Sequence, residues 1–290
     1  MTARFAIVGA GKVGTALVRL LVGGGWEFAG AASRSLESAQ RACSFAGCGE
    51  ATTDPADVTQ GTGLVFLTVP DDAIRAVCDE LAERGALGPG SVVAHCSGAL
   101  TSAVLQSAAE AGASVGSLHP MQSFATVEQA LQNLPGSCCC IEGDASAVEM
   151  LREVAEVLGA AVVTVPTESK PLYHAAGCVA SNYLVALQNA ALKLNRAAGI
   201  SRDDALKIML PLLRGTLDNF ARVGLPDCLT GPIARGDVET VRRHLEAIQA
   251  SVPGLLDLYK VLGLEAVEVA EAKGTLSAAD AEKLRGILSH

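Results

Sequence analysis

The 290-residue sequence has few charged and few aromatic residues, which make up 18% and 3% of the chain. Its 22 Lys and Arg are outnumbered by 31 Asp and Glu, which gives a net charge of -9. Because phosphate binding needs clustered cations, this balance argues against nucleic acid as a partner. No apolar run reaches the ~18 residues of a membrane span, and no signal peptide precedes the first predicted strand. We therefore expect a cytoplasmic protein without a membrane partner.

The sequence also lacks the cysteine and histidine spacings of a zinc site, although it contains nine cysteines. It has no CxxC or HxxxH pair, and Cys138, Cys139 and Cys140 alternate along one predicted strand. Free cysteine packs as a small apolar residue, and disulfides are rare in a reducing compartment. We expect a reduced protein without a metal ion.

Short apolar strands alternate with helices through the first half of the chain, and half of all residues are hydrophobic. This alternation predicts an α/β fold with a doubly wound, mostly parallel sheet and helices on both faces. The pattern after residue 166 is helical throughout. We predict an α/β domain over 1–166 and an all-helical domain over 167–290. The predicted strands are 4–10, 28–34, 63–69, 91–96, 113–118, 138–143 and 160–166.

A glycine motif lies between the first predicted strand and the first predicted helix. In GxGxxG loops the first glycine makes a tight turn, the second lets backbone N–H groups approach a pyrophosphate, and the third permits close packing. The helix N-terminus adds partial positive charge. The position favours a dinucleotide site of the Rossmann type over a glycine-rich turn without a ligand. The predicted loop is Gly9, Ala10, Gly11, Lys12, Val13 and Gly14.

The end of the second predicted strand indicates which dinucleotide binds. An NAD site usually has Asp or Glu there, whereas this chain has Ser33, Arg34 and Ser35 and no carboxylate before Glu37. An arginine flanked by hydroxyls suits a 2′-phosphate, because it can donate charge-assisted hydrogen bonds. We expect NADP(H) rather than NAD(H), the alternative being that Arg34 is a solvated loop residue.

The nicotinamide end of the cofactor is expected at the carboxyl ends of the next two parallel strands. Thr68, Val69 and Pro70 follow one of these strands, and Cys96 and Ser97 follow the other. These residues are predicted to contact the cofactor. The alternative for Ser97 is a plain turn residue.

Five sequence stretches together resemble a known bacterial family of oxidoreductases. These proteins join a Rossmann-like domain to a helical C-terminal domain long catalogued as of unknown function, and some are assigned as alternative ketopantoate reductases. The layout is also similar to prephenate dehydrogenase, 6-phosphogluconate dehydrogenase-like proteins and pyrroline-5-carboxylate reductase. The resemblance implies hydride transfer between NADP(H) and a carbonyl or imine carbon. The stretches are VGAGKVGTAL, HCSGAL, GSLHPMQSF, YHAAGCVASNYLVAL and LTGPIARGD.

The resemblance also implies roles for individual residues. Ser97 stands where prephenate dehydrogenases have a serine beside the nicotinamide, His119 matches their His-Pro element, and His174 matches a histidine on the helix that opens the second domain. Asn182 fits the asparagine of β-hydroxyacid dehydrogenases, but Cys178 stands one turn earlier where those enzymes have a lysine.

Reduction of a ketone needs an acid, and His119 and His174 are the main candidates because imidazole titrates near neutrality. For each histidine the alternative is a buried packing role. Lys170 is predicted to act as the acid or to bind a substrate carboxylate, the alternative being a surface lysine. The catalytic set is therefore His119, His174, Ser97, Lys170 and Asn182.

Four further residues are predicted to contact the substrate: Gln122, Ser123, Tyr173 and Arg235. We expect a reductase of a small 2-oxo acid, with ketopantoate as the candidate. The alternatives are a prephenate-like dehydrogenase, an imino-acid reductase, or a non-catalytic NADP-binding sensor. The amphipathic helices of the second half favour a homodimer.

Overall fold

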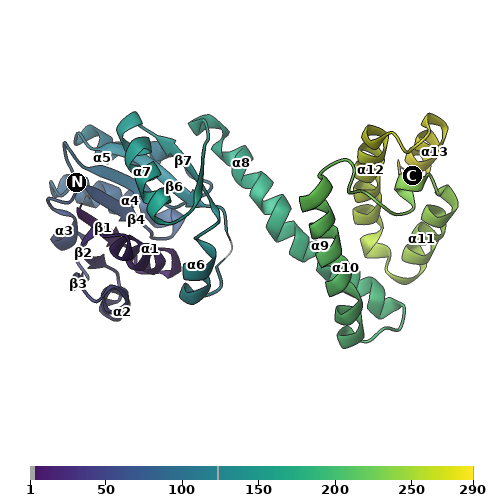
Figure 1. The fold of residues 1–290 in the computed structure, drawn as a ribbon, viewed down its shortest axis with the longest axis horizontal. Coiled ribbons are helices and arrows are strands. Elements are labelled where there is room, and N and C mark those ends of the chain that lie inside the picture. The colour runs from purple at the N-terminus through teal and green to yellow at the C-terminus, as the bar shows by residue number, and fades with distance from the viewer. Residues whose placement is uncertain (1–3, 123, 290) are drawn as a thin grey trace. The chain divides into compact units, whose positions relative to one another are not determined.

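The computed structural model describes residues 4–122 and 124–289. The chain divides into two compact units, one ending at Val179 and one beginning at Ala180. The division falls later in the chain than the predicted boundary after residue 166. Figure 1 shows the helices and strands of each unit.

The first unit contains a sheet of eight strands in the order β3-β2-β1-β4-β5-β6-β7-β8. The pairs from β3 to β6 are all parallel, β6 and β7 are antiparallel, and β7 and β8 are parallel. The first six strands have the order of a Rossmann sheet, which confirms the predicted fold class. The strands are β1 (Arg4–Val8), β2 (Glu27–Ala32), β3 (Glu50–Thr52), β4 (Leu64–Leu67), β5 (Val92–His95), β6 (Ser114–Pro120), β7 (Cys138–Gly143) and β8 (Ala161–Thr164).

Helices cover both faces of the sheet because successive strand residues point to opposite sides. In β4, Leu64 and Phe66 belong to one apolar cluster, and Val65 and Leu67 belong to another. The first cluster is covered by α1 (Lys12–Gly23), α2 (Leu36–Ala46) and α7 (Ala145–Val157). The second is covered by α4 (Asp71–Glu83) and α5 (Gln106–Glu110), which follows the short 3-10 turn η1 (Ser102–Leu105).

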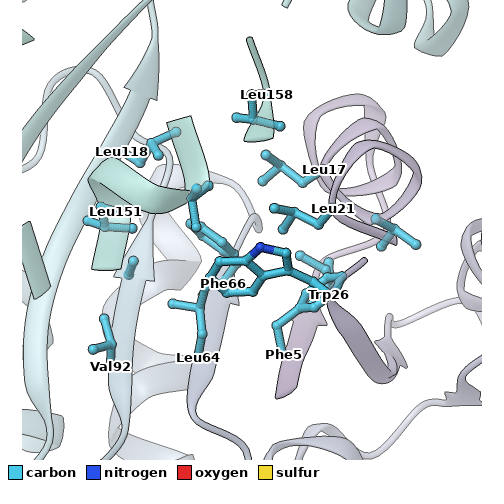
Figure 2. Packing of buried hydrophobic residues seen from close by; sticks show 14 of the residues in the cluster. Phe5, Leu17, Leu21, Trp26, Leu64, Phe66, Val92, Leu118, Leu151 and Leu158 are labelled. Carbon is cyan, nitrogen blue, oxygen red and sulfur yellow. The ribbon is translucent and has the colours of Figure 1, made fainter. Parts of the chain in front are cut away.

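Four aromatic residues of the unit, Phe5, Trp26, Phe28 and Phe66, lie in the first cluster. Figure 2 shows Phe5, Trp26 and Phe66 beside the leucines of α1. The ring centroids of Phe5 and Trp26 are 6.4 Å apart in an edge-to-face arrangement. This packing fixes α1 against β1, and so places the loop between them.

Three features of the first unit differ from the sequence prediction or add to it. The strand β3 was not predicted, because only three residues pair there and they form no apolar run. The helices α3 (Pro55–Thr59) and α6 (Val127–Asn133) were also not predicted, since each is too short for a helical period. The predicted strand over 113–118 continues to Pro120, so His119 lies inside β6 rather than after it.

After β8 the chain becomes helical, as predicted. The turn η2 (Thr167–Ser169) leads into α8 (Lys170–Gly177), and one π turn (Cys178–Asn182) leads into α9 (Tyr183–Ala197). The described part of the second unit contains only helices and turns. Its longer helices are α9, α10 (Arg202–Val223), α11 (Val238–Ser251), α12 (Leu256–Lys273) and α13 (Ala278–Ser289).

The apolar core of the second unit lies between its last three helices. Val241 of α11, Val267 of α12 and Leu284 of α13 are fully buried together. By contrast, α9 has no buried residue and α10 has only Ala205 and Met209. The apolar side chains of α9 and α10 therefore remain largely unburied within this unit.

Candidate active site

The glycine loop between β1 and α1 has the tight turn, the open approach and the close packing that the motif predicts. Gly9 has φ 108°, and a Cβ on it would lie 2.6 Å from the carbonyl carbon of Thr68. A Cβ on Gly14 would lie 2.3 Å from the carbonyl oxygen of Gly9. On Gly11 it would meet no heavy atom of the described residues within 4 Å. The middle glycine therefore borders open space, where a ligand can approach the backbone.

The open space is a groove of about 800 Å³. Gly11 is the N-cap of α1 and caps it without a side-chain hydrogen bond, so the first N–H groups of the helix are available to an anion. The groove is lined by eight of the predicted cofactor residues: Gly9, Ala10, Gly11, Ser33, Arg34, Thr68, Val69 and Pro70. The residues present fit a dinucleotide phosphate.

The remaining predicted cofactor residues lie outside the groove lining. Lys12 is exposed in the first turn of α1, and Val13 packs against the core. The hydroxyl of Ser35 caps α2 by accepting from the Ser38 N–H at 3.4 Å. Cys96 packs against the core, and burial raises the pKa of its thiol to about 12.

At the end of β2 the groove is lined by a cation, Arg34. Arg34 is exposed and makes no ion pair or hydrogen bond with any of the residues that the structure describes. Glu37, the nearest acid after it in sequence, is paired with Arg41 at 3.3 Å. Arg41 also donates to the hydroxyl of Ser38, which lines the groove. This end of the groove therefore suits an additional phosphate.

Ser97 has a hydroxyl that is already fully used in hydrogen bonds. It donates to the Asp71 carboxylate at 2.7 Å and accepts from the N–H groups of Ala99 at 3.2 Å and Leu100 at 3.0 Å. With its proton directed at Asp71, Ser97 has the geometry of a turn residue, which was the alternative reading of this position. The turn links the start of α4 to the end of β5.

His95 is a buried histidine with both ring nitrogens occupied. Nδ1 accepts from the Ser97 N–H at 3.1 Å, and Nε2 faces the Thr101 carbonyl at 3.2 Å. Burial, together with the positive charge of Lys170, lowers the pKa of His95 to about 4. His95 is therefore a neutral packing residue.

The two histidines predicted as catalytic meet over Gly98. Their ring centroids are 5.9 Å apart at an angle of 71°. A Cβ on Gly98 would lie 2.5 Å from His174 Cδ2 and 2.7 Å from His119 Nε2. His119 Nδ1 is 3.3 Å from the Tyr173 hydroxyl. The structure thus brings together three of the predicted residues, from β6 and from α8.

The protonation of these groups follows from their burial. Burial, together with the nearby His174 and Lys170, lowers the pKa of His119 to about 4. Burial raises the pKa of Tyr173, whose hydroxyl also hydrogen-bonds the Cys140 thiol. At neutral pH His119 is therefore a neutral imidazole and Tyr173 a neutral phenol. His119 can orient a ligand by hydrogen bonding but is a poor source of a proton as an imidazolium.

Lys170 lies in a place that neither reading of the sequence anticipated. Its side chain is 0% exposed, so it is not a surface lysine and does not reach into open solvent. Its ammonium is 3.3 Å from the carboxylate of Glu142, which is 1% exposed. Glu142 was not selected from the sequence, although a single carboxylate within the apolar segment CCCIEG was a signal that it needs a buried partner.

The remaining predicted residues are Gln122, Ser123, Asn182 and Arg235. Gln122 is exposed just after β6, and Ser123 lies outside the described residues. Asn182 ends the π turn in the second unit and is exposed. Arg235 is exposed at the end of the turn η4 (Ile233–Arg235) of the second unit.

Neither a metal-binding cluster nor a membrane-spanning helix is present in the part of the chain that the structure describes. Within 4–122 and 124–289, no group of three or more His, Cys, Asp or Glu is placed to hold a metal ion. In the same ranges, no helix has both the length and the apolar character needed to cross a membrane.

Each half of the chain matches the model of a known domain. Residues 2–120 match the model of a Rossmann-like domain. Residues 137–266 match the model of a domain of unknown function, DUF2520. The chain therefore combines a Rossmann-like domain with a DUF2520 domain, which confirms the resemblance drawn from its motifs. No curated protein matches the chain.

Solved structures share the whole fold. Protein TM1727 from Thermotoga maritima is 27% identical with a TM-score of 0.76, and the alignment covers 93% of this chain and 99% of that one. BF3122 from Bacteroides fragilis, named provisionally as an NADP oxidoreductase, is 23% identical with a TM-score of 0.73, over 92% and 98%. A pyrroline-5-carboxylate reductase from Coxiella burnetii is 15% identical with a TM-score of 0.62, over 98% and 99%.

Proposed function

We propose that this protein is an NADP(H)-dependent oxidoreductase that reduces a small 2-oxo acid, with ketopantoate as the candidate substrate. One observation carries the proposal: the dinucleotide groove is connected to the histidine pair by a short chain of contacts. Pro70 and Asp72 line the groove, and Asp71 between them binds Ser97. The next residue, Gly98, lies against both imidazoles. Names of proteins with the same fold include an NADP oxidoreductase, which supports this choice.

When bound, the nicotinamide would supply the hydride, and the chain's own residues would bind and orient the reactants. The N–H groups at the start of α1 bind the pyrophosphate, and Ser33 and Arg34 bind a 2′-phosphate. His119, being neutral, orients the substrate oxygen through Nε2, the ring nitrogen that lies beside Gly98. This leaves His174 as the proton donor that completes the reduction.

The direct experiment measures turnover. Wild-type protein is mixed with NADPH and ketopantoate, and loss of NADPH absorbance is followed, with NADH as the matched comparison. We expect oxidation of NADPH and much slower oxidation of NADH. NADP⁺ reduction with prephenate would support the prephenate-like dehydrogenase instead. Tight NADPH binding without turnover of any 2-oxo or imino acid would support the sensor.

One observation favours imine reduction as a second candidate. Lys170 is buried and paired with Glu142, so its ammonium is not available to a substrate carboxylate. A 2-oxo acid calls for a cation for its carboxylate, and Arg235 is the residue that the sequence predicts for this role. A neutral cyclic imine needs none. Arg235→Ala separates the two: it should raise KM for 2-oxo acids and leave KM for a neutral imine unchanged.

We also propose that the protein forms a homodimer through its second unit. Leu212 and Phe220 of α10 are 68% and 53% exposed, and Tyr183 and Val185 of α9 are 60% and 70% exposed. Monomers rarely expose apolar patches of more than a few hundred Å², and a second copy offers a matching apolar surface. Sedimentation should give a dimer for the wild type.

The dimer proposal has a matched pair of variants. Leu212→Glu places a charge on the exposed apolar face of α10 and should give a monomer. Glu282→Lys changes an exposed residue of α13 and should leave the dimer intact. A monomeric wild type, or a dimeric Leu212→Glu, would contradict the proposal.

A further inference from the structure

A buried ion pair joins the elements that carry the two histidines, because Lys170 and His174 share α8, and Glu142 lies on β7 beside the strand of His119. The ammonium of Lys170 and the carboxylate of Glu142 are 3.3 Å apart, with side chains 0% and 1% exposed. Charges are rarely buried to this extent, because removing them from water is costly unless each is paired and hydrogen-bonded. Because burial of charges is costly, we expect this pair to have a role other than stabilising the fold.

The Glu142 carboxylate collects donors from several segments of the first unit. Its Oε1 accepts from the Ser102 N–H at 2.9 Å and from the Ser117 hydroxyl at 2.6 Å. Its Oε2 accepts from the Ser102 hydroxyl at 2.8 Å and from the Thr167 hydroxyl at 3.0 Å. Lys170 also donates to Ser117. The network therefore joins η1, β6, β7, η2 and α8.

The strand register relates this network to the histidine pair. In the antiparallel pair β6–β7, Ser117 is opposite Glu142 and His119 is opposite Cys140. Residues two apart on a strand share a face, so these two rungs point to the same side of the sheet. Lys170 of α8 binds the first rung, and Tyr173 of α8 binds the second. One helix thus contacts two successive rungs with side chains three residues apart, which lie on one helix face.

We propose that Lys170 and Glu142 are positioning residues, which hold α8 on strands β6 and β7 so that Tyr173 and His174 are set against His119. The proposed catalytic use of the histidines belongs to the proposed function, on which this inference rests. Neither Lys170 nor Glu142 touches the substrate in this account. A shift of α8 by a fraction of a helical turn would separate His174 from Gly98 and Tyr173 from His119.

Lys170 also contributes to the charge state of His119. The groups that face or neighbour His119 are Tyr173, His174 and Lys170 from α8, Asp71 at the start of α4, Cys140 from β7, and His95 and Cys96 at the end of β5. Among these, the positive charge of Lys170 lowers the pKa of His119, after burial and His174. Loss of the pair therefore has a titration signature that a purely structural role does not produce.

The test replaces both charges in the full-length protein. Lys170→Met alone leaves a buried carboxylate without its partner and should yield little folded protein. The double variant Lys170→Met/Glu142→Gln leaves no unpaired charge and keeps similar side-chain volumes, so it should fold. The matched control is Arg4→Met/Glu27→Gln, which removes an exposed ion pair of the same unit.

The primary readout is the titration of His119, followed by NMR of its imidazole in ¹³C-labelled protein without substrate. In the double variant we expect the His119 pKa to rise from about 4 toward the ordinary value, and the contact with Tyr173 to be lost. In the control, both should be as in the wild type. An unchanged pKa and unchanged imidazole shifts in a folded double variant would overturn the proposal.

The second readout uses turnover and separates this inference from the proposed function. If the proposed function is correct, the double variant should lose roughly tenfold to a hundredfold in kcat, with NADPH affinity within about twofold of the wild type. Wild-type kcat in the double variant would overturn the positioning role. If the wild type has no turnover at all, the proposed function fails, and the NMR titration still decides the role of the ion pair.

Discussion

Replacing Gly98 with alanine tests whether the contact of the two imidazoles has a chemical purpose. The new Cβ would lie 2.5 Å from His174 Cδ2, 2.7 Å from His119 Nε2 and 2.8 Å from His119 Cε1. Ordinary contacts begin at 3.4 Å, so the rings must move by roughly 1 Å. Gly98 does not have a positive φ, so alanine introduces no backbone strain.

A displacement of about 1 Å in a reacting group can cost about a hundredfold in rate, and overpacking typically costs 1–3 kcal/mol of stability. We therefore expect Gly98→Ala to fold, to bind NADPH as the wild type does, and to lose about a hundredfold in kcat. The assay is NADPH oxidation, with imidazole NMR as the readout of ring position. The control is Gly88→Ala, whose Cβ would meet only the Ala111 carbonyl oxygen at 3.8 Å. Wild-type kcat and unshifted imidazole signals in Gly98→Ala would refute the reasoning.

Three further predictions follow from the groove and the buried histidines. Arg34→Ala should weaken NADPH binding at least tenfold and leave NADH binding unchanged, because only NADPH has the 2′-phosphate. Nucleotide fluorescence measures both affinities, and equal losses for the two nucleotides would show that Arg34 does not bind the 2′-phosphate. His119→Asn and His174→Asn should each lower kcat with little change in NADPH affinity, and the loss should be larger for His174 if it is the proton donor; full activity in both would contradict the assignment. Stability should fall as the pH drops from about 6.5 to about 4, because His95 and His119 have pKa values near 4 in the folded protein and bind protons more readily when unfolded. Each histidine contributes up to about 3 kcal/mol to this loss in the free energy of unfolding, which denaturant unfolding at several pH values measures. A free energy of unfolding that does not change with pH, or a pH profile that is the same in His95→Gln, would show that burial of these rings is not the cause.

The features predicted correctly from the sequence are those determined by local pattern. The alternation of apolar strands and helices predicted the sheet, and the spacing of Gly9, Gly11 and Gly14 predicted the turn, the open approach and the close packing. The sheet and the loop depend on the direction of the chain over a few residues. The placement of His119 and His174 at one site came instead from the resemblance of their motifs to a known family, and the structure brings the two rings together.

The features that were missed depend on register between distant strands. Lys170 was expected to face the substrate or the solvent, because the sequence does not reveal that β6 and β7 are antiparallel and place Glu142 opposite Ser117. The saturated hydroxyl of Ser97 likewise depends on Asp71, which is 26 positions away in the sequence. Such contacts follow from packing of the whole unit, which local periodicity does not determine.

The most direct test of the account is the affinity of NADPH for the wild type and for Gly11→Val. Gly11 has ordinary extended backbone angles, with φ -81° and ψ -167°, and a side chain there would project into open space. We predict that the variant keeps its thermal stability, because nothing in the described chain is displaced. We predict also that it loses at least tenfold in NADPH affinity, because the new side chain occupies the approach of the pyrophosphate. Equal affinity in the two proteins, or no NADPH binding by the wild type, would contradict the account.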